Sequence, residues 1–294
     1  MRFKASVLAI LTLVGCSPSA DEGGRSTGPS GIDGSEVRIE GRVDVGGHEL
    51  AYICQGRGAP TVLLEAGYDS PGTETFADLI DSIAQTTRVC TYDRAGTGTS
   101  DARPQELNLT SADHADELHE LLDGAKIDPP YVVAAHSYGG FVARLFAANY
   151  RAEMAGLVLI ESSHEDEIEP YRRYFGDDAA GDWVDGGDLL DMTTTAKALR
   201  QGARDFGDLP LIAIRTERYE DVLNESLWKR TQAKLASYSN NSVRAVALGS
   251  GHFAQDDAPS VVMDAIRAVV EAGRTEEPLP SCDDIFDAGE ADCG

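Results

Sequence analysis

The chain has 294 residues, and 42% of them are hydrophobic, which is ordinary for a globular protein and enough to build a sizeable core. Its 50 acidic and 25 basic residues give it a formal net charge of −25. A charge this negative, without a basic run to contact phosphates, argues against binding to nucleic acid or to an anionic membrane surface. We therefore expect no nucleic-acid partner.

Residues 1–16 combine a basic start with a short apolar run that ends at Cys16. The run is too short to span a bilayer and is typical of a secretory signal. Its end, Leu13-Val14-Gly15-Cys16, resembles the bacterial lipobox, whose cysteine is diacylated; a plain signal with an incidental cysteine is the alternative. Residues 17–35 are rich in Ser, Gly, Pro and Asp and predict a flexible tether. We expect an exported protein, lipid-anchored to the periplasmic or extracellular face of the cell envelope, that meets the membrane only through this anchor.

From residue 36 onward, strand-like runs alternate with helical ones. Short apolar runs rich in β-branched residues predict strands at 37–43, 49–54, 61–65, 88–92, 131–135, 157–160, 211–214 and 243–248. Apolar residues at helical spacing predict helices near 75–85, 113–122, 227–236 and 261–272. The first two strands flank Gly46-Gly47, a hairpin signal. A hairpin followed by alternating strands and helices predicts a mostly parallel sheet with helices on both faces.

The turn at residues 136–140 reads His-Ser-Tyr-Gly-Gly, between a buried strand and an amphipathic helix. It matches the nucleophile elbow G-x-S-x-G, with Ala135 at the first position, and its context of strand before and helix after is the required one. A sharp turn of this kind lifts the hydroxyl of Ser137 clear of the backbone. The following helix points its amino end at the place where an oxyanion would form.

The strand order, this elbow and the segments 92–100 and 249–253 together resemble the α/β-hydrolase superfamily, over roughly residues 37–272. The resemblance implies a mostly parallel eight-stranded sheet with helices on both faces. It places the hydrolase domain at 36–275, with a small cap insertion at about 162–209 and an acidic tail at 276–294. One departure is Ala66-Gly67-Tyr68, where many relatives carry His-Gly. No metal cluster, phosphate loop or dinucleotide fingerprint is visible, so we expect no cofactor or metal.

In this family the nucleophile, the acid and the histidine follow one another along the chain. Ser137 is then the nucleophile, and His252 is the base because it alone of the six histidines comes late enough. Two places remain open for the acid. Glu161 ends an apolar strand, where an unpaired charge is too costly to serve packing alone, and is the first choice. Glu220, in a highly charged run after the next strand, is the alternative.

The resemblance also assigns two backbone groups and one cysteine pair, and two cysteines remain in the tail. The oxyanion donors should be the N–H groups of Tyr68 and Tyr138. Neighbouring strands should bring Cys54 to Cys90, and Cys282–Cys293 would close a loop in the acidic tail. That tail lacks the spacing of a calcium-binding EF-hand loop. The aromatics of the cap insertion could line a substrate subsite or form the cap's own small core; they are Tyr171, Tyr174, Phe175 and Trp183.

These observations predict a serine hydrolase that cleaves small-molecule carboxylic esters through an acyl-enzyme. Serine at the elbow argues against dehalogenase and epoxide hydrolase chemistry, which normally place aspartate there. Lactones (including macrolide lactones), thioesters and peptides stay open as substrates because the triad does not set the substrate. A catalytically idle fold used as a binding module is the alternative of another class. The sequence does not specify an oligomeric state.

Overall fold

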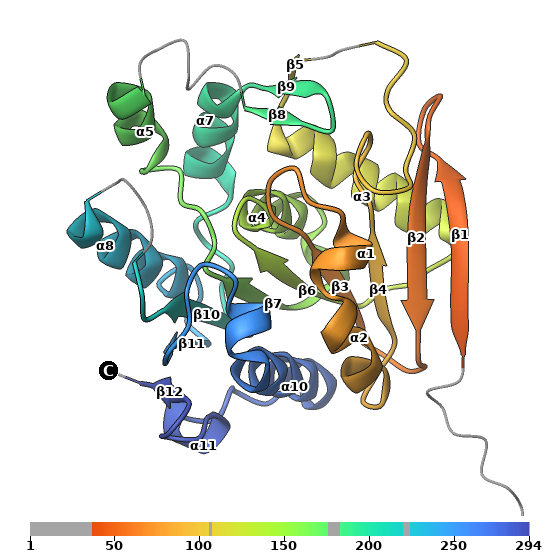
Figure 1. Cartoon of the computed structure of the whole chain (residues 1–294). Helices are drawn as coiled ribbons and strands as arrows, with labels where there is room; N and C mark the ends of the chain where they lie inside the picture. The colour runs from red at the N-terminus through yellow and green to blue at the C-terminus, as the bar shows by residue number, and fades with distance from the viewer. Residues whose placement is uncertain (1–36, 106–107, 176–182, 220–223, 294) are drawn as a thin grey trace, which may run out of the picture. The chain divides into compact units, whose positions relative to one another are not determined.

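The computed structural model describes residues 37–105, 108–175, 183–219 and 224–293 (Figure 1). Contacts divide the chain into residues 1–32 and Asp33–Gly294, and every described residue belongs to the second unit. The predicted signal, Cys16, the tether and Glu220 lie outside the described residues. Within the described ranges, no helix has the length and apolar character needed to cross a membrane.

Nine of the described strands form one mixed sheet in the order β1-β2-β4-β3-β6-β7-β10-β11-β12. Their bounds are Arg38–Asp44 (β1), Glu49–Gln55 (β2), Thr61–Glu65 (β3), Val89–Tyr92 (β4), Tyr131–His136 (β6), Met154–Ile160 (β7), Leu211–Thr216 (β10), Ser242–Ala247 (β11) and Ala291–Asp292 (β12). The pairs from β4 to β11 are parallel, whereas β1–β2, β2–β4 and β11–β12 are antiparallel. The predicted count of eight strands was therefore one short.

The ninth strand comes from the acidic tail. Cys282 and Cys293 form a disulfide, and the short β12 between them pairs with β11. Phe286 and Ala291 are buried against the sheet, so the tail carries apolar groups that need covering. The other predicted pair, Cys54–Cys90, is also bonded, because β2 and β4 are neighbours and place these two residues opposite each other.

Alternation of side chains along the central strands explains why both faces of the sheet are covered. Val133 and Ala135 of β6 point to one side, into a core shared with α3 and α4. Val132 and Ala134 point to the other, into a core shared with α2 and α10. The strand is buried along its whole length and therefore reads as a continuous apolar run.

The described helices of four residues or more are Gly72–Thr75 (α1), Ala77–Ala84 (α2), Ser111–Ala125 (α3), Gly139–Asn149 (α4), Ile168–Phe175 (α5), Met192–Gly202 (α7), Glu225–Ala236 (α8), Ala254–Asp257 (α9), Pro259–Thr275 (α10) and Cys282–Ile285 (α11). A 3₁₀ turn, η2, spans Arg151–Glu153. Between β7 and β10 the chain forms α5, a small hairpin of β8 (Val184–Asp185) and β9 (Asp188–Leu190), and α7. This hairpin and β5 (Asn108–Leu109) make a second, three-stranded sheet. Figure 1 shows α5, α7 and this sheet gathered near one another at the top of the view.

Candidate active site

Ser137 occupies the turn between β6 and α4. Its φ of 51° lies in the left-handed region, which a non-glycine residue adopts rarely and which is typical of a strained functional turn. Its N–H donates to the Ile160 carbonyl at 3.1 Å, which ties the turn to the end of β7. Gly139 is required next to it: a Cβ there would lie 2.5 Å from the Ala66 carbonyl oxygen. The elbow can therefore form only because α4 starts with a residue that lacks a side chain.

His252 lies on the loop between β11 and α9, with its Nε2 3.1 Å from Oγ of Ser137. Two further contacts hold this loop. Nε2–H of His136 donates to the His252 carbonyl at 2.8 Å, and the N–H of Gly251 donates to Asp257 at 2.7 Å. Burial lowers the pKa of His136 to about 3, so this ring stays neutral and acts as a donor. The structure thus brings together the predicted nucleophile and base.

Glu161 follows β7 directly and, like Ser137, has a positive φ, of 44°. One carboxylate oxygen accepts from the N–H and the hydroxyl of Thr216 at 2.9 and 3.0 Å, and the other accepts from Nε1 of Trp228. Among the described hydrogen bonds there is none between Glu161 and His252, although both line the same cavity. Burial raises the pKa of Glu161, against the hydrogen bonds from Thr216 and Trp228 that favour its ionised form. Since a carboxylate offers about four acceptor sites, the oxygen facing Trp228 can accept one more hydrogen bond.

The other predicted acid, Glu220, lies outside the described residues. The described chain just before it runs beside the histidine loop. The N–H of Arg218 donates to the Ser250 carbonyl at 3.0 Å, and Glu217 accepts from the N–H of Gly249 at 2.7 Å. Arg218 and Tyr219 line the same cavity as His252.

The predicted oxyanion donors belong to two segments that meet at the nucleophile. Tyr138 follows Ser137, and Tyr68 lies on the loop after β3. A Cβ on Gly67 would lie 3.4 Å from the Ser137 Cβ, so this loop passes directly beside the nucleophile. Within the described part of the chain, neither backbone N–H makes a hydrogen bond, which leaves both open to an incoming oxygen.

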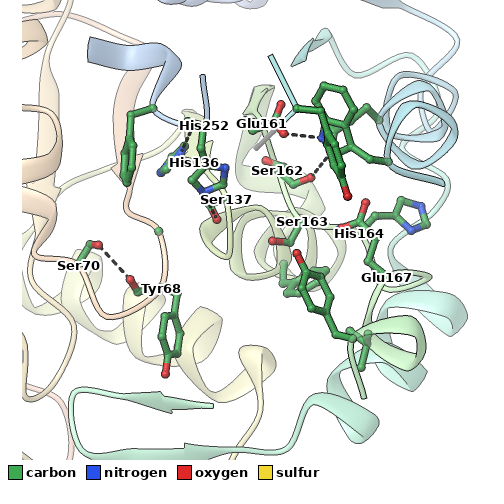
Figure 2. A pocket seen from close by; sticks show the side chains of 18 of the residues that line it. Tyr68, Ser70, His136, Ser137, Glu161, Ser162, Ser163, His164, Glu167 and His252 are labelled. Atoms are coloured by element: carbon green, nitrogen blue, oxygen red, sulfur yellow. Dashed lines mark hydrogen bonds between the residues drawn. The ribbon is translucent and has the colours of Figure 1, made fainter. Parts of the chain in front are cut away.

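Ser137, His252 and Glu161 line a cavity of about 670 Å³, the size of a small-molecule site. Figure 2 shows His136 and His252 next to Ser137, with Glu161 and Tyr68 on opposite sides of the view. The cap contributes Tyr171 and Trp183 to the lining. The predicted cap aromatics thus divide: these two face the cavity, Tyr174 is exposed, and the side chain of Phe175 is not described.

One group of possible metal ligands stands beside this cavity: His164, Glu165 and Asp166. Cationic side chains already hold both carboxylates. Arg144 bonds Glu165 at 2.7 Å, and Lys234 bonds Asp166 at 2.6 Å. The imidazole is engaged too, because its Nδ1 accepts from the N–H of Asp166 and its Nε2 faces the Tyr238 hydroxyl at 2.7 Å. The three residues thus belong to an ion-pair network, in which His164 and Glu165 are buried and Asp166 is partly exposed.

Comparison with known proteins fits this geometry. A family model described as "alpha/beta hydrolase fold" matches residues 52–251, which include the elbow and end one residue before His252. The chain belongs to the α/β-hydrolase family.

Relatives and structural neighbours of this hydrolase are diverse. The uncharacterized protein YqjL of Bacillus subtilis (strain 168) is 27% identical over 226 residues, which cover 72% of this chain and 84% of that protein. A thermophilic esterase from Thermogutta terrifontis superposes with a TM-score of 0.58 at 19% identity, over 80% of this chain and 99% of that one. Cfl2 from Burkholderia cenocepacia superposes with a TM-score of 0.59 at 18% identity, over 79% of this chain and 96% of that one. At such identities the two structures support the fold alone.

Sequence reasoning missed several residues around the site. Trp228 and Thr216, which hold the Glu161 carboxylate, come from α8 and from the end of β10 and carry no motif. His136 was interpreted as part of the turn, yet its ring holds the carbonyl of the proposed base. Its position inside the elbow motif was the only signal that could have indicated this role.

Proposed function

We propose that this hydrolase cleaves carboxylic esters through an acyl-enzyme formed on Ser137. The observation that carries the proposal is the 3.1 Å distance between Nε2 of His252 and Oγ of Ser137, made at a strained turn at the end of β6. A serine hydroxyl is a poor nucleophile near neutral pH unless a base removes its proton. The base here is adjacent and its loop is held by two hydrogen bonds.

In the proposed reaction, His252 Nε2 takes the hydroxyl proton as Oγ of Ser137 forms a bond to the ester carbonyl carbon. The carbonyl oxygen becomes an oxyanion, which accepts from the N–H groups of Tyr68 and Tyr138. The bond to the alkoxy oxygen then breaks, and the alcohol leaves with the proton from His252. A water molecule repeats the sequence on the acyl-enzyme, which releases the carboxylic acid and restores the serine.

The proposal assigns the orientation of His252 to Glu161, with Glu220 as the alternative acid. Nε2 of His252 faces the serine, so the acid must accept from Nδ1. Glu161 supports this assignment by its place on the cavity wall and by the acceptor site left on its Trp228-facing oxygen. Its three hydrogen bonds favour the ionised form, which can stabilise an imidazolium, against the burial that raises the pKa of Glu161.

The lining of the cavity supports ester substrates with an apolar or aromatic part. Aromatic side chains from the cap, from α4 and α8, and from loops that follow the strands contribute to it: Tyr68, Phe141, Tyr171, Trp183, Tyr219, Trp228 and Phe253. Such rings give large apolar contact at low entropic cost. We further propose, from the signal-like sequence ending at Cys16, that the enzyme is exported and held by an N-terminal lipid.

Labelling with a fluorophosphonate tests the proposed function. The reagent should modify one serine, and peptide mass spectrometry should place the adduct on Ser137 with parallel loss of activity on p-nitrophenyl esters. A series of these esters of increasing acyl length then defines the substrate preference. Absence of both labelling and ester turnover would instead support the idle binding module.

A further inference from the structure

A buried arginine holds the backbone of the oxyanion loop, defined here as residues 66–69. Arg94, only 3% exposed, follows β4 and donates to the carbonyl of Ala66 at 3.1 Å and to that of Gly67. These are the two carbonyls immediately before Tyr68. Asp93 and Arg94 lie in the segment 92–100, one of the segments that resemble the hydrolase superfamily. In the structure Asp93 holds the local turn through Thr73 and Thr99, whereas Arg94 reaches across to the catalytic side.

Two buried carboxylates neutralise this arginine. Glu65, at the end of β3, bonds it at 2.7 Å, and Asp185, from the β8–β9 hairpin of the cap, bonds it through both oxygens at 2.6 and 3.0 Å. Burial alone would raise the pKa of Asp185, but the charge and hydrogen bonds of Arg94 outweigh it and hold the pKa at about 2. The fork geometry matters, because a guanidinium can serve two carboxylates and two carbonyls at fixed angles.

The cap hairpin also grips the oxyanion loop directly. Asp185 accepts from the N–H of Asp69 at 2.7 Å, and the N–H of Val184 donates to the Tyr68 hydroxyl at 2.8 Å. The hairpin turn is seated against the loop after β4 with no space for a side chain. A Cβ on Gly186 would lie 1.8 Å from the Ala95 carbonyl oxygen. Tyr68 is therefore fixed from both sides, by the cap and by Arg94.

The second oxyanion donor depends on the same arginine. The guanidinium of Arg94 lies over the ring of Tyr138, 5.4 Å from its centroid. The phenol of Tyr138 is held in turn by the hydroxyl of Ser111 at 3.0 Å and by Nδ1 of His114 at 3.1 Å. The side chain of Tyr138 thus ends in the buried polar cluster around Arg94, whereas Tyr68, whose ring is exposed, is held through the Gly67 carbonyl and the Val184 N–H.

We infer that Arg94 and Asp185 are positioning residues for the oxyanion hole, and that the cap hairpin completes this hole rather than only covering the cavity. The inference rests on the proposed ester hydrolysis and deepens it. Donors for an oxyanion act only when they are fixed where the charge develops, so a small displacement of Tyr68 lowers the rate without weakening the binding of the ground state.

Asp185→Asn tests the inference, with Asp188→Asn as its matched control. Asp188 lies in the same hairpin, is also buried and bonds Arg103, whose described ion-pair partners, Asp188 and Glu117, both lie outside the oxyanion loop. Three quantities are measured for each variant: kcat per serine titrated with fluorophosphonate, KM for a p-nitrophenyl ester, and the inhibition constant of a trifluoromethyl ketone, which forms a tetrahedral adduct. Thermal unfolding reports the stability cost of each change.

For Asp185→Asn we expect kcat per site to fall about 10- to 100-fold, since loss of one whole oxyanion donor costs about 100- to 1,000-fold. KM should stay unchanged, and ketone affinity should fall by the same factor as kcat. Asp188→Asn should lose stability but not kcat. If Asp185→Asn does not fold, Arg94→Lys, which keeps the charge and loses the fork, should give the same pattern. The inference would be overturned if the two aspartate variants had the same kcat, or if KM rose as kcat fell in both. A Ser137→Ala variant that stays active would overturn the proposed function instead.

Discussion

Replacing Glu161 by glutamine removes a charge from the cavity wall and keeps the volume. If Glu161 orients His252, the imidazolium that forms during attack loses its counter-charge, and the amide can stabilise the wrong tautomer. We expect kcat to fall by up to about 10⁴-fold with KM changed little. A loss of that size is about 5.5 kcal/mol of transition-state stabilisation.

The structure also predicts a stability cost for this variant. The carboxylate accepts three hydrogen bonds, two from Thr216 and one from Trp228. An amide has a single acceptor oxygen, so its NH₂ group must face either an indole N–H or the Thr216 donors. One buried donor is then left unsatisfied, which costs about 1–3 kcal/mol in the free energy of unfolding. Chemical denaturation and active-site titration separate this cost from the loss of turnover.

Glu167→Gln is the control for burial, because Glu167 is another buried cavity carboxylate, held by Thr231 and by the His164 N–H. It should reproduce the stability loss without the large fall in kcat. Glu220→Gln tests the alternative acid and should behave like an ordinary surface change. If Glu220→Gln abolishes turnover while Glu161→Gln leaves kcat per site near the wild-type value, the assignment of Glu161 is wrong.

Three further predictions concern stability and processing. The disulfides Cys54–Cys90 and Cys282–Cys293 join residues 36 and 11 positions apart, so chain entropy predicts that removing them lowers the free energy of unfolding by about 4 and about 3 kcal/mol. Denaturant unfolding of variants with both cysteines of a pair replaced by serine measures this, and unchanged midpoints would contradict it. Burial lowers the pKa of three histidines below the unfolded value of 6.5, to about 3, 3 and 4, so the unfolded state binds more protons as the pH falls. The free energy of unfolding should fall below about pH 6.5, by about 2 kcal/mol per histidine between pH 7 and 5. A free energy of unfolding that does not change over this range would refute the neutral state of His114, His136 and His164. Cys16→Ser should leave the enzyme unlipidated and its catalytic constants unchanged, whereas a wild-type protein that mass spectrometry finds without lipid would contradict the anchor.

The sequence predicted the parts of the fold that depend on local pattern. Buried parallel strands read as apolar runs, so β3, β6, β7 and β10 were located to within a few residues, and the elbow was readable from its small residues. The tail strand β12 was missed because two residues, Ala291-Asp292, carry no periodicity. Its pairing depends on a disulfide and on the burial of Phe286.

Long-range polar contacts escaped prediction for a different reason. Arg94 and Asp185 are 91 residues apart, and each reads as an ordinary charged residue next to a glycine-containing turn. Only the folded chain shows that both are buried and that they share the oxyanion loop. The contacts of Glu161 with Thr216 and Trp228 were equally unreadable, because they join the ends of two strands and a helix face.

The most direct test of the central claim is the turnover of Ser137→Ala on a p-nitrophenyl ester. The change removes one hydroxyl from a turn whose backbone is held by the Ile160 carbonyl, so the fold and its thermal midpoint should be retained. We expect kcat to fall on the order of 10³-fold or more and fluorophosphonate labelling to disappear. A folded Ser137→Ala protein that hydrolyses the ester at a rate near that of the wild type would contradict the account.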